Sequence, residues 1–138
     1  MPYENEFSHT TSFKLTKNEI IKFASQYDSH LFHLEDRGAI ESIFGGLITS
    51  GLHCIYKIWD QSPIDKKKFE LIAGLGFTVR FNKPIYADID YLIEQSIVDK
   101  KDYEKLDNAH IYKSIRVIKN DKHEHLLEIE SNEIIREN

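Results

Sequence analysis

The chain has 138 residues, of which 41% are hydrophobic and 30% are charged, and its formal net charge is −5. A chain of this length buries roughly 70% of its unfolded surface, which predicts one domain over residues 1–138. A negative charge without a basic face argues against nucleic acid as a partner. The absence of any apolar stretch near the roughly 20 residues that span a bilayer argues against a membrane partner.

The first half of the chain predicts one strand followed by helices. Residues 10–16, TTSFKLT, alternate as a strand does. Thr16 then stands three residues before Glu19, which is the spacing of a capping box, and an apolar helical face follows as far as Tyr27. A short helix is predicted over residues 35–43.

The middle of the chain predicts an extended segment and a second long helix. Residues 44–50, FGGLITS, combine two glycines with a β-branched pair, so they favour an extended or looping path. Ser50 is a good N-cap for a helix over residues 50–61. Apolar side chains cover nearly the whole surface of this helix, which predicts that it is buried.

The second half of the chain predicts four strands. They are long, rich in β-branched residues and partly alternating, and they cover residues 69–81, 85–99, 109–119 and 125–137. A strand and helices followed by a run of strands is the α+β pattern. We therefore expect one antiparallel sheet packed on a buried helix.

Asp28 and His33 are the candidate acid and base. Positions five apart on a continuous helix lie about 140° from each other, so the two side chains meet only if the helix ends near Tyr27 and the chain turns. Beside each other against apolar walls, the carboxylate can take a proton from water while the imidazole positions that water. The structural alternative is that Asp28 caps the next helical turn and His33 is a hydrogen-bonded core residue.

Gly51 is the candidate donor to a substrate oxygen. It opens the second long helix, where a backbone N–H has no partner within the helix and lies at the positive end of the dipole. Such an N–H can stabilise negative charge that develops on a carbonyl oxygen. The alternative is that the glycine only allows tight packing where the helix enters the core.

These residues carry a family resemblance. Residues 27–51 resemble the MaoC-like dehydratases, which include the (R)-specific enoyl-CoA hydratases, with the signature Asp-x-Asn-Pro-x-His followed by Phe-Gly-x-x-Ile-x-x-Gly. Asp28 and His33 stand at the acid–base positions, and FGGLITSG matches the second part. GLGFTVRFNKPIYADI looks like the family's Gly-x-x-x-x-Arg-Phe-x-x-Pro-Val strand pair. His30-Leu31 stands where the family has Asn-Pro, and Ser50 stands where it often has His.

The resemblance implies a hotdog fold, in which an antiparallel sheet wraps a central helix, and a hydro-lyase activity. Asp28 would deprotonate water, His33 would hold it, and the N–H of Gly51, with Ser50 beside it, would bind the thioester oxygen. The reaction hydrates a trans-2-enoyl thioester or dehydrates a 3-hydroxyacyl thioester. It needs no cofactor beyond the thioester substrate, which would be an acyl-CoA or acyl-carrier-protein thioester. The resemblance also implies a homodimer or a dimer of dimers.

Three alternatives remain open at this point. A hotdog thioesterase would need a carboxylate or a nucleophile on the central helix, where only Ser50 and Asp60, at its two ends, qualify. A binding module for acyl thioesters that has lost catalysis would explain the altered His30-Leu31 turn. A dimerising structural domain would bind no ligand at all.

The remaining histidines and the single cysteine predict no metal site. A zinc site needs three or four ligands in a fixed geometry, and the pairs His30/His33 and His123/His125 offer two each. Cys54 is expected to be a small buried hydrophobe. One cysteine suits a reducing compartment, and the first residues lack a signal pattern, so we expect a cytoplasmic protein.

Overall fold

The computed structural model describes residues 9–35, 42–61 and 67–138, and for Leu31 and Phe32 it describes the backbone only. The described strands form one antiparallel sheet of five strands in the order β1-β3-β4-β5-β2. Their bounds are β1 His9–Phe13, β2 Phe69–Phe81, β3 Tyr91–Asp102, β4 Ala109–Lys119 and β5 His125–Glu137. The predicted α+β architecture is confirmed.

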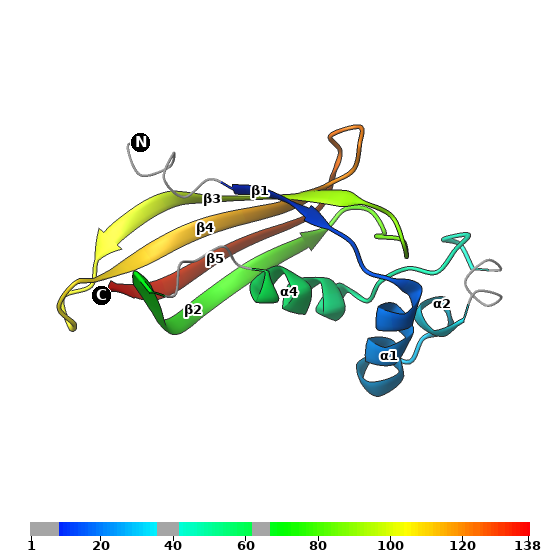
Figure 1. Ribbon diagram of the computed structural model, residues 1–138, viewed down its shortest axis with the longest axis horizontal. Coiled ribbons are helices and arrows are strands. Elements are labelled where there is room, and N and C mark those ends of the chain that lie inside the picture. Colours follow the sequence, from blue (N-terminus) through cyan, green and yellow to red (C-terminus); the bar gives the residue numbers. More distant parts are fainter. Residues whose placement is uncertain (1–8, 36–41, 62–66) are drawn as a thin grey trace.

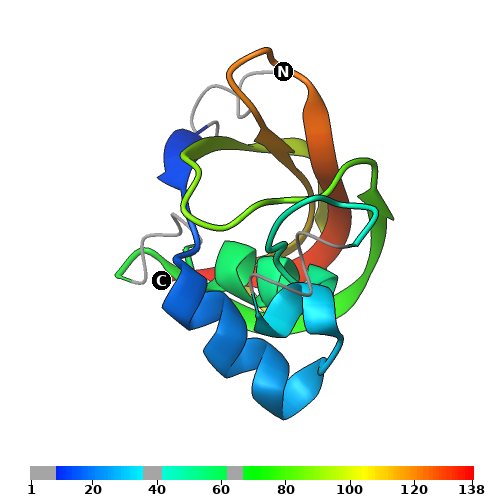
Figure 2. The same cartoon turned by 90° about the vertical axis from the view of Figure 1, so that its right-hand side faces the viewer.

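Three helices accompany the sheet in the part of the chain that the structure describes. They are α1 Lys17–Tyr27, α2 Leu31–Leu34 and α4 Gly51–Asp60. Figure 1 shows α4 running along one face of the sheet, with α1 and α2 beyond its N-terminal end. Figure 2, turned by 90°, shows the strands curving around α4. No helix in the described part of the chain is long and apolar enough to cross a membrane.

The core lies between α4 and the concave face of the sheet. Cys54 and Ile58 are the apolar buried residues of α4, and they pack against apolar side chains from the strands and from the segments that flank them. The strand residues of this cluster include Phe13, Tyr91, Ile93, Ile118, Leu126, Leu127 and Ile129. Because side chains alternate along a strand, Tyr91 and Ile93 of β3 share one face, as do Leu127 and Ile129 of β5, whereas Leu126 lies at an irregularity in the pairing of β4 with β5.

A buried polar group continues the concave face beyond the apolar core. Arg116 donates hydrogen bonds to Gln95, Ser131 and Glu133, and its guanidinium lies 5.7 Å from the ring centroid of Trp59 on α4. Arg116 and Glu133 are both buried. A buried charge pair of this kind needs its hydrogen bonds satisfied, and the neighbouring Gln95 and Ser131 provide them.

Of the two helix caps predicted from the sequence, the cap of α1 is present and the side-chain cap of α4 is not. The Thr16 side chain accepts from the Glu19 N–H, and the Glu19 side chain accepts from the Thr16 backbone N–H, so the predicted capping box is confirmed. Ser50 stands at the N-cap of α4 but makes no side-chain cap hydrogen bond. Its hydroxyl is used elsewhere, at the site described below.

The strand predicted over residues 85–99 is partly wrong. Residues 85–87 pair with residues 47–49 instead: Thr49 N donates to Ile85 O at 2.7 Å and Ala87 N donates to Leu47 O at 3.1 Å. Asp88 then adopts a φ of 59°, which breaks the strand, and its carboxylate accepts from the Lys17 N–H at the start of α1. β3 begins only at Tyr91 and continues to Asp102.

Two smaller expectations also change. The first strand ends at Phe13 rather than at residue 16, because Thr16 is needed as the cap of α1. The short helix predicted over residues 35–43 falls mostly on residues 36–41, which lie outside the described residues. The extended or looping path expected over residues 44–50 is confirmed, because residues 44–46 form a turn and bends and residues 47–49 pair with residues 85–87.

Candidate active site

Asp28 and His33 meet as the spacing predicts. α1 ends at Tyr27, Asp28 is its C-cap, and the N–H of Asp28 donates to Ala24 O. The chain then turns into α2, which carries His33. His33 Nε2 lies 3.5 Å from Asp28 Oδ2, too long for a good direct hydrogen bond but close enough for both atoms to contact one water molecule.

Besides His33, two further groups contact the Asp28 carboxylate. His30 Nδ1 lies 2.5 Å from Oδ1, and the hydroxyl of Ser50 donates to Oδ2 at 3.0 Å. Burial raises the pKa of Asp28, but the hydrogen bonds from His30 and Ser50 and the nearby histidine charges outweigh it. The pKa of Asp28 therefore lies below its ordinary value, and the carboxylate is ionised at neutral pH.

The imidazole of His33 is buried and held by the backbone. Its Nδ1 lies 2.7 Å from the carbonyl oxygen of Ile48, which can only accept, so Nδ1 carries a proton. In the neutral ring Nε2 is then an acceptor facing a second acceptor, Asp28 Oδ2. A water molecule between them could donate one proton to each, which is the arrangement that activates water for attack.

Gly51 begins α4 beside this pair. A Cβ placed on Gly51 would lie 2.7 Å from Cε1 of Phe81. The ring of Phe81 therefore packs directly over the glycine, which supports the packing explanation. Because the N–H of Gly51 belongs to the first turn of α4, it has no acceptor within the helix and can serve a ligand.

A cavity of about 440 Å³ reaches His33 and Gly51, whereas Asp28 and Ser50 are not among its lining residues. His33, Thr49 and Gly51 line it at the start of α4, and Cys54 lies one turn further along the same helix. Its apolar lining includes Phe44, Ile48, Phe81, Pro84, Ile85 and Leu127. Burial raises the pKa of Cys54 to about 12, so this thiol stays protonated and behaves as the expected small hydrophobe.

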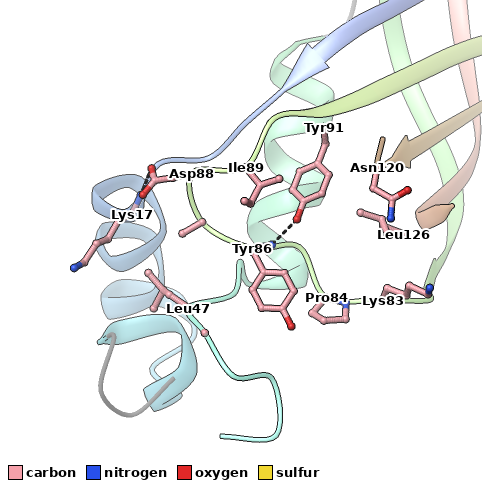
Figure 3. A pocket seen from close by; sticks show the side chains of 12 residues that line it. Lys17, Leu47, Lys83, Pro84, Tyr86, Asp88, Ile89, Tyr91, Asn120 and Leu126 are labelled. Carbon is pink, nitrogen blue, oxygen red and sulfur yellow. Dashed lines mark hydrogen bonds between the residues drawn. The ribbon is translucent and has the colours of Figure 1, made fainter. Parts of the chain in front are cut away.

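A second cavity of about 710 Å³ adjoins the first one, since Lys83 and Pro84 line both. Figure 3 shows Lys17 and Lys83 at its opposite ends and Tyr86 and Tyr91 between them. The hydroxyl of Tyr91 accepts from the Tyr86 N–H at 3.0 Å and so braces the segment that pairs with residues 47–49.

Asp28, His30 and His33 could also hold a metal ion. One ligand atom from each of these side chains lies within 4.8 Å of the other two. Three such ligands suffice for a catalytic zinc site with an open position. The expectation that this chain uses no metal therefore stays a prediction.

The sequence did not reveal two of these features. His30 appeared only as part of an H-x-x-H pair, and its contact with Asp28 follows from the turn between α1 and α2. Ser50 was expected as a helix cap beside Gly51, whereas its hydroxyl contacts the acid–base pair. The sequence indicated that Ser50 lies at the start of a helix, because it precedes a glycine that opens one. Nothing in the sequence indicated that its hydroxyl contacts Asp28.

One curated relative shows similarity along the sequence. It is the uncharacterized protein YdeM of Bacillus subtilis, which is 28% identical over 96 residues that make up 67% of each chain. No protein-family model matches the chain.

Solved structures show similarity along the whole fold. The MaoC-like dehydratase from Rhodospirillum rubrum has a TM-score of 0.78 at 20% identity over 96% of this chain and 90% of its own. A monoamine oxidase regulatory protein from Archaeoglobus has a TM-score of 0.76 at 23% identity, over 95% and 89%. The HadBC (3R)-hydroxyacyl-ACP dehydratase complex of Mycobacterium tuberculosis has a TM-score of 0.72 at 16% identity, over 93% of each chain.

These likenesses cover between 93% and 96% of this chain. The fold implied by the sequence resemblance is thereby confirmed. This chain has the hotdog fold of the MaoC-like dehydratases.

Proposed function

We propose that this protein is a hydro-lyase that adds water to trans-2-enoyl thioesters, or removes it from 3-hydroxyacyl thioesters. The observation that carries the proposal is the 3.5 Å approach of Asp28 Oδ2 and His33 Nε2, next to a cavity that begins at Gly51. The fold shared with dehydratases supports it, although one fold serves many chemistries.

The chemistry follows from the polarity of the substrate. The β-carbon of an enoyl thioester is electrophilic, but water is too weak a nucleophile to add without a base. Asp28, ionised at neutral pH, takes a proton from the water that Nε2 of His33 holds. As the bond to the β-carbon forms, negative charge moves to the thioester oxygen, where the N–H of Gly51 stabilises it. The proton that Asp28 took from the water is then delivered to the α-carbon with the help of His33, which completes the addition and regenerates the carboxylate.

The two cavities give room for a thioester. The first holds the reacting enoyl group, since His33 and Gly51 both line it. The second adjoins it at Lys83 and Pro84 and supplies space for a further part of the acyl-CoA or acyl-carrier-protein thioester. Lys17 and Lys83 stand at its opposite ends (Figure 3), but the ammonium of Lys83 pairs with Glu124, so this cavity provides space for the carrier and not a site of uncompensated positive charge.

We also propose that the protein is a homodimer, alone or as a dimer of dimers. β2 is an edge strand, and an edge strand offers its unpaired backbone groups to another chain. Large apolar side chains are exposed along it and on α4, namely Leu71, Leu75, Phe77, Phe81, Leu52 and Tyr56. A second copy would cover this surface, and HadBC shows that a protein of this fold forms a complex.

One observation favours a second candidate, a module that binds acyl thioesters without converting them. His30 Nδ1 at 2.5 Å occupies Oδ1 of Asp28, and the Ser50 hydroxyl occupies Oδ2. Two donors weaken a carboxylate as a base. His30→Asn tests this candidate, because it removes the ring that contacts Oδ1 of Asp28: an enzyme should change its rate of hydration, whereas a binding module should stay inactive.

The test is the loss of enoyl-thioester absorbance when the protein meets crotonyl-CoA, followed by thioesters with longer acyl chains. We expect turnover by the wild type and its loss in Asp28→Asn and His33→Ala. Asp90→Asn and His125→Ala are the matched controls, since both residues are exposed. Turnover that survives both dyad changes would show that Asp28 and His33 are not the acid and base.

A further inference from the structure

Thr49 is buried at the active-site cavity with an unused hydroxyl. Its side chain lines the same cavity as His33 and Gly51, and the residue is 6% exposed. Within residues 9–35, 42–61 and 67–138, no group forms a hydrogen bond with Thr49 Oγ1. A buried hydroxyl without a hydrogen-bond partner destabilises a protein, so a role in binding a ligand would explain why this position carries one.

The usual explanation, a cap for the following helix, does not apply. Thr49 and Ser50 stand directly before Gly51, where hydroxyl side chains normally accept from the first N–H groups of a helix. The Ser50 side chain makes no cap hydrogen bond and donates to Asp28 instead. The Thr49 hydroxyl has no partner among the described groups either. The first turn of α4 is thus left without a cap from the two side chains best placed to provide one.

Other polar side chains of the cavity are already engaged. Asn82 Nδ2 donates to His125 O at 3.1 Å, and Lys83 pairs with Glu124. His33 is held by Ile48 O and faces Asp28. The hydroxyl of Thr49 is therefore a buried donor on a residue that lines the cavity, and it is not committed to another residue that the structure describes.

We propose that Thr49 Oγ1 donates a hydrogen bond to the thioester oxygen of the substrate and acts with the N–H of Gly51 as a second donor. This inference rests on the proposed function and deepens it. The two donors come from residues two apart in the chain and line one cavity. No covalent bond changes at Thr49: the hydroxyl keeps its proton and stabilises the negative charge that the oxygen gains while water adds to the β-carbon.

The hydroxyl costs stability in the unliganded protein and is useful only when an oxygen binds. This predicts opposite effects of two substitutions. Thr49→Val keeps the branched shape and removes the hydroxyl, so it should melt at or above the wild-type temperature while activity falls. Thr49→Ser keeps the hydroxyl and loses a buried methyl group, so it should melt lower while activity stays near that of the wild type.

The experiment measures turnover of crotonyl-CoA and thermal melting for the wild type, Thr49→Val and Thr49→Ser. We expect kcat of Thr49→Val to fall about 100-fold, as for loss of one donor to an oxyanion. Wild-type kcat in Thr49→Val would overturn the inference. A melting temperature of Thr49→Val well below that of the wild type would also overturn it, because the hydroxyl would then be bonded in the free protein.

A second readout separates this inference from the proposed function. Butyryl-CoA, the saturated thioester, cannot be hydrated but presents the same oxygen, so it should raise the melting temperature of the wild type more than that of Thr49→Val. If the wild type binds butyryl-CoA but does not hydrate crotonyl-CoA, the proposed hydration is wrong. The difference in melting shift between the wild type and Thr49→Val then decides whether Thr49 binds the thioester oxygen. If butyryl-CoA shifts neither protein and no turnover occurs, both proposals are overturned.

Discussion

Replacement of Ser50 by alanine tests the electrostatics of the candidate acid–base pair. The Ser50 hydroxyl donates to Asp28 Oδ2 at 3.0 Å, and Ser50 makes no helix cap. Ser50→Ala therefore removes one hydrogen bond to a carboxylate and leaves the cap of α4 unchanged. We expect a loss of stability at neutral pH and a pKa of Asp28 closer to its ordinary value.

The size of the effect follows from the exposure of the carboxylate. A hydrogen bond to a charged group contributes about 1.5–3 kcal/mol. The Asp28 side chain is 22% exposed, so water replaces part of the lost bond and the lower end of this range applies. A loss of about 1.5 kcal/mol lowers the urea midpoint by roughly 0.5–1.5 M for slopes of about 1–3 kcal/mol per M.

The pH dependence gives the sharper assay. The pKa of Asp28 is lowered in the folded protein, so its contribution to stability is complete above the ordinary pKa of 3.8 and is lost as pH falls through the folded pKa. The stability gap between the wild type and Ser50→Ala should therefore be full at neutral pH and close in acid. In kinetics, the acid limb of kcat/KM should move to higher pH, because Asp28 must be ionised to act as a base.

Thr16→Ala is the matched control. Thr16 is a true helix cap, so its loss should cost about 1 kcal/mol with no change in the acid limb of kcat/KM. A stability gap for Ser50→Ala that is the same in acid and at neutral pH would refute the reasoning, since the hydroxyl would then not act through the ionised carboxylate.

Three further predictions concern the core, the metal question and the dimer. Arg116→Ala should lower the free energy of unfolding in urea by about 3–5 kcal/mol, because it leaves the buried Glu133 unpaired. Arg136→Ala, at the exposed pair with Glu70, should lower it by less than about 1 kcal/mol. Equal losses would contradict this account of the core. Treatment with EDTA should leave turnover of crotonyl-CoA unchanged, and a loss that zinc restores would instead assign Asp28, His30 and His33 as metal ligands. Leu75→Asp should shift the protein toward monomer in sedimentation equilibrium, because it places a charge on the exposed β2 surface. Leu92→Asp on β3 is the control and should not change the mass. An unchanged mass for Leu75→Asp would exclude β2 as the dimer surface.

The strands that the sequence predicted best are those with the longest uninterrupted pattern. The ranges 69–81, 109–119 and 125–137 match β2, β4 and β5. β4 and β5 are bounded by turn residues, and β2 keeps its strand pairing although it contains Gly74 and Gly76 and pairs with β5 through two irregularities. The range 85–99 failed because Asp88 and Asp90 interrupt the alternation, and tertiary contacts then decide the path: residues 85–87 pair with residues 47–49, and Asp88 binds the start of α1.

The site was predictable in part for a similar reason. The spacing of Asp28 and His33 required the helix to end near Tyr27, and that local requirement fixed their meeting. The partners of the pair come from far along the chain. Ser50 lies 22 residues from Asp28, and Ile48 lies 15 residues from His33. No local pattern reports such contacts, because they depend on how residues 47–50 pair with the segment after β2.

The turn at His30-Leu31 shows how this chain can keep the pair in place without the proline of the Asn-Pro motif. A proline would fix one backbone angle between Asp28 and His33. Here the N–H of His33 donates to His30 O at 2.9 Å, and the His30 ring binds Asp28 Oδ1, so the same short segment is closed by two hydrogen bonds. Ile48 O then fixes the ring of His33 from the opposite side. The restraint that a proline builds into the backbone is thus supplied by contacts, one of which uses an ionisable ring. The geometry of the pair should consequently depend on the His30 side chain, a dependence that a chain with Asn-Pro at these positions would not have.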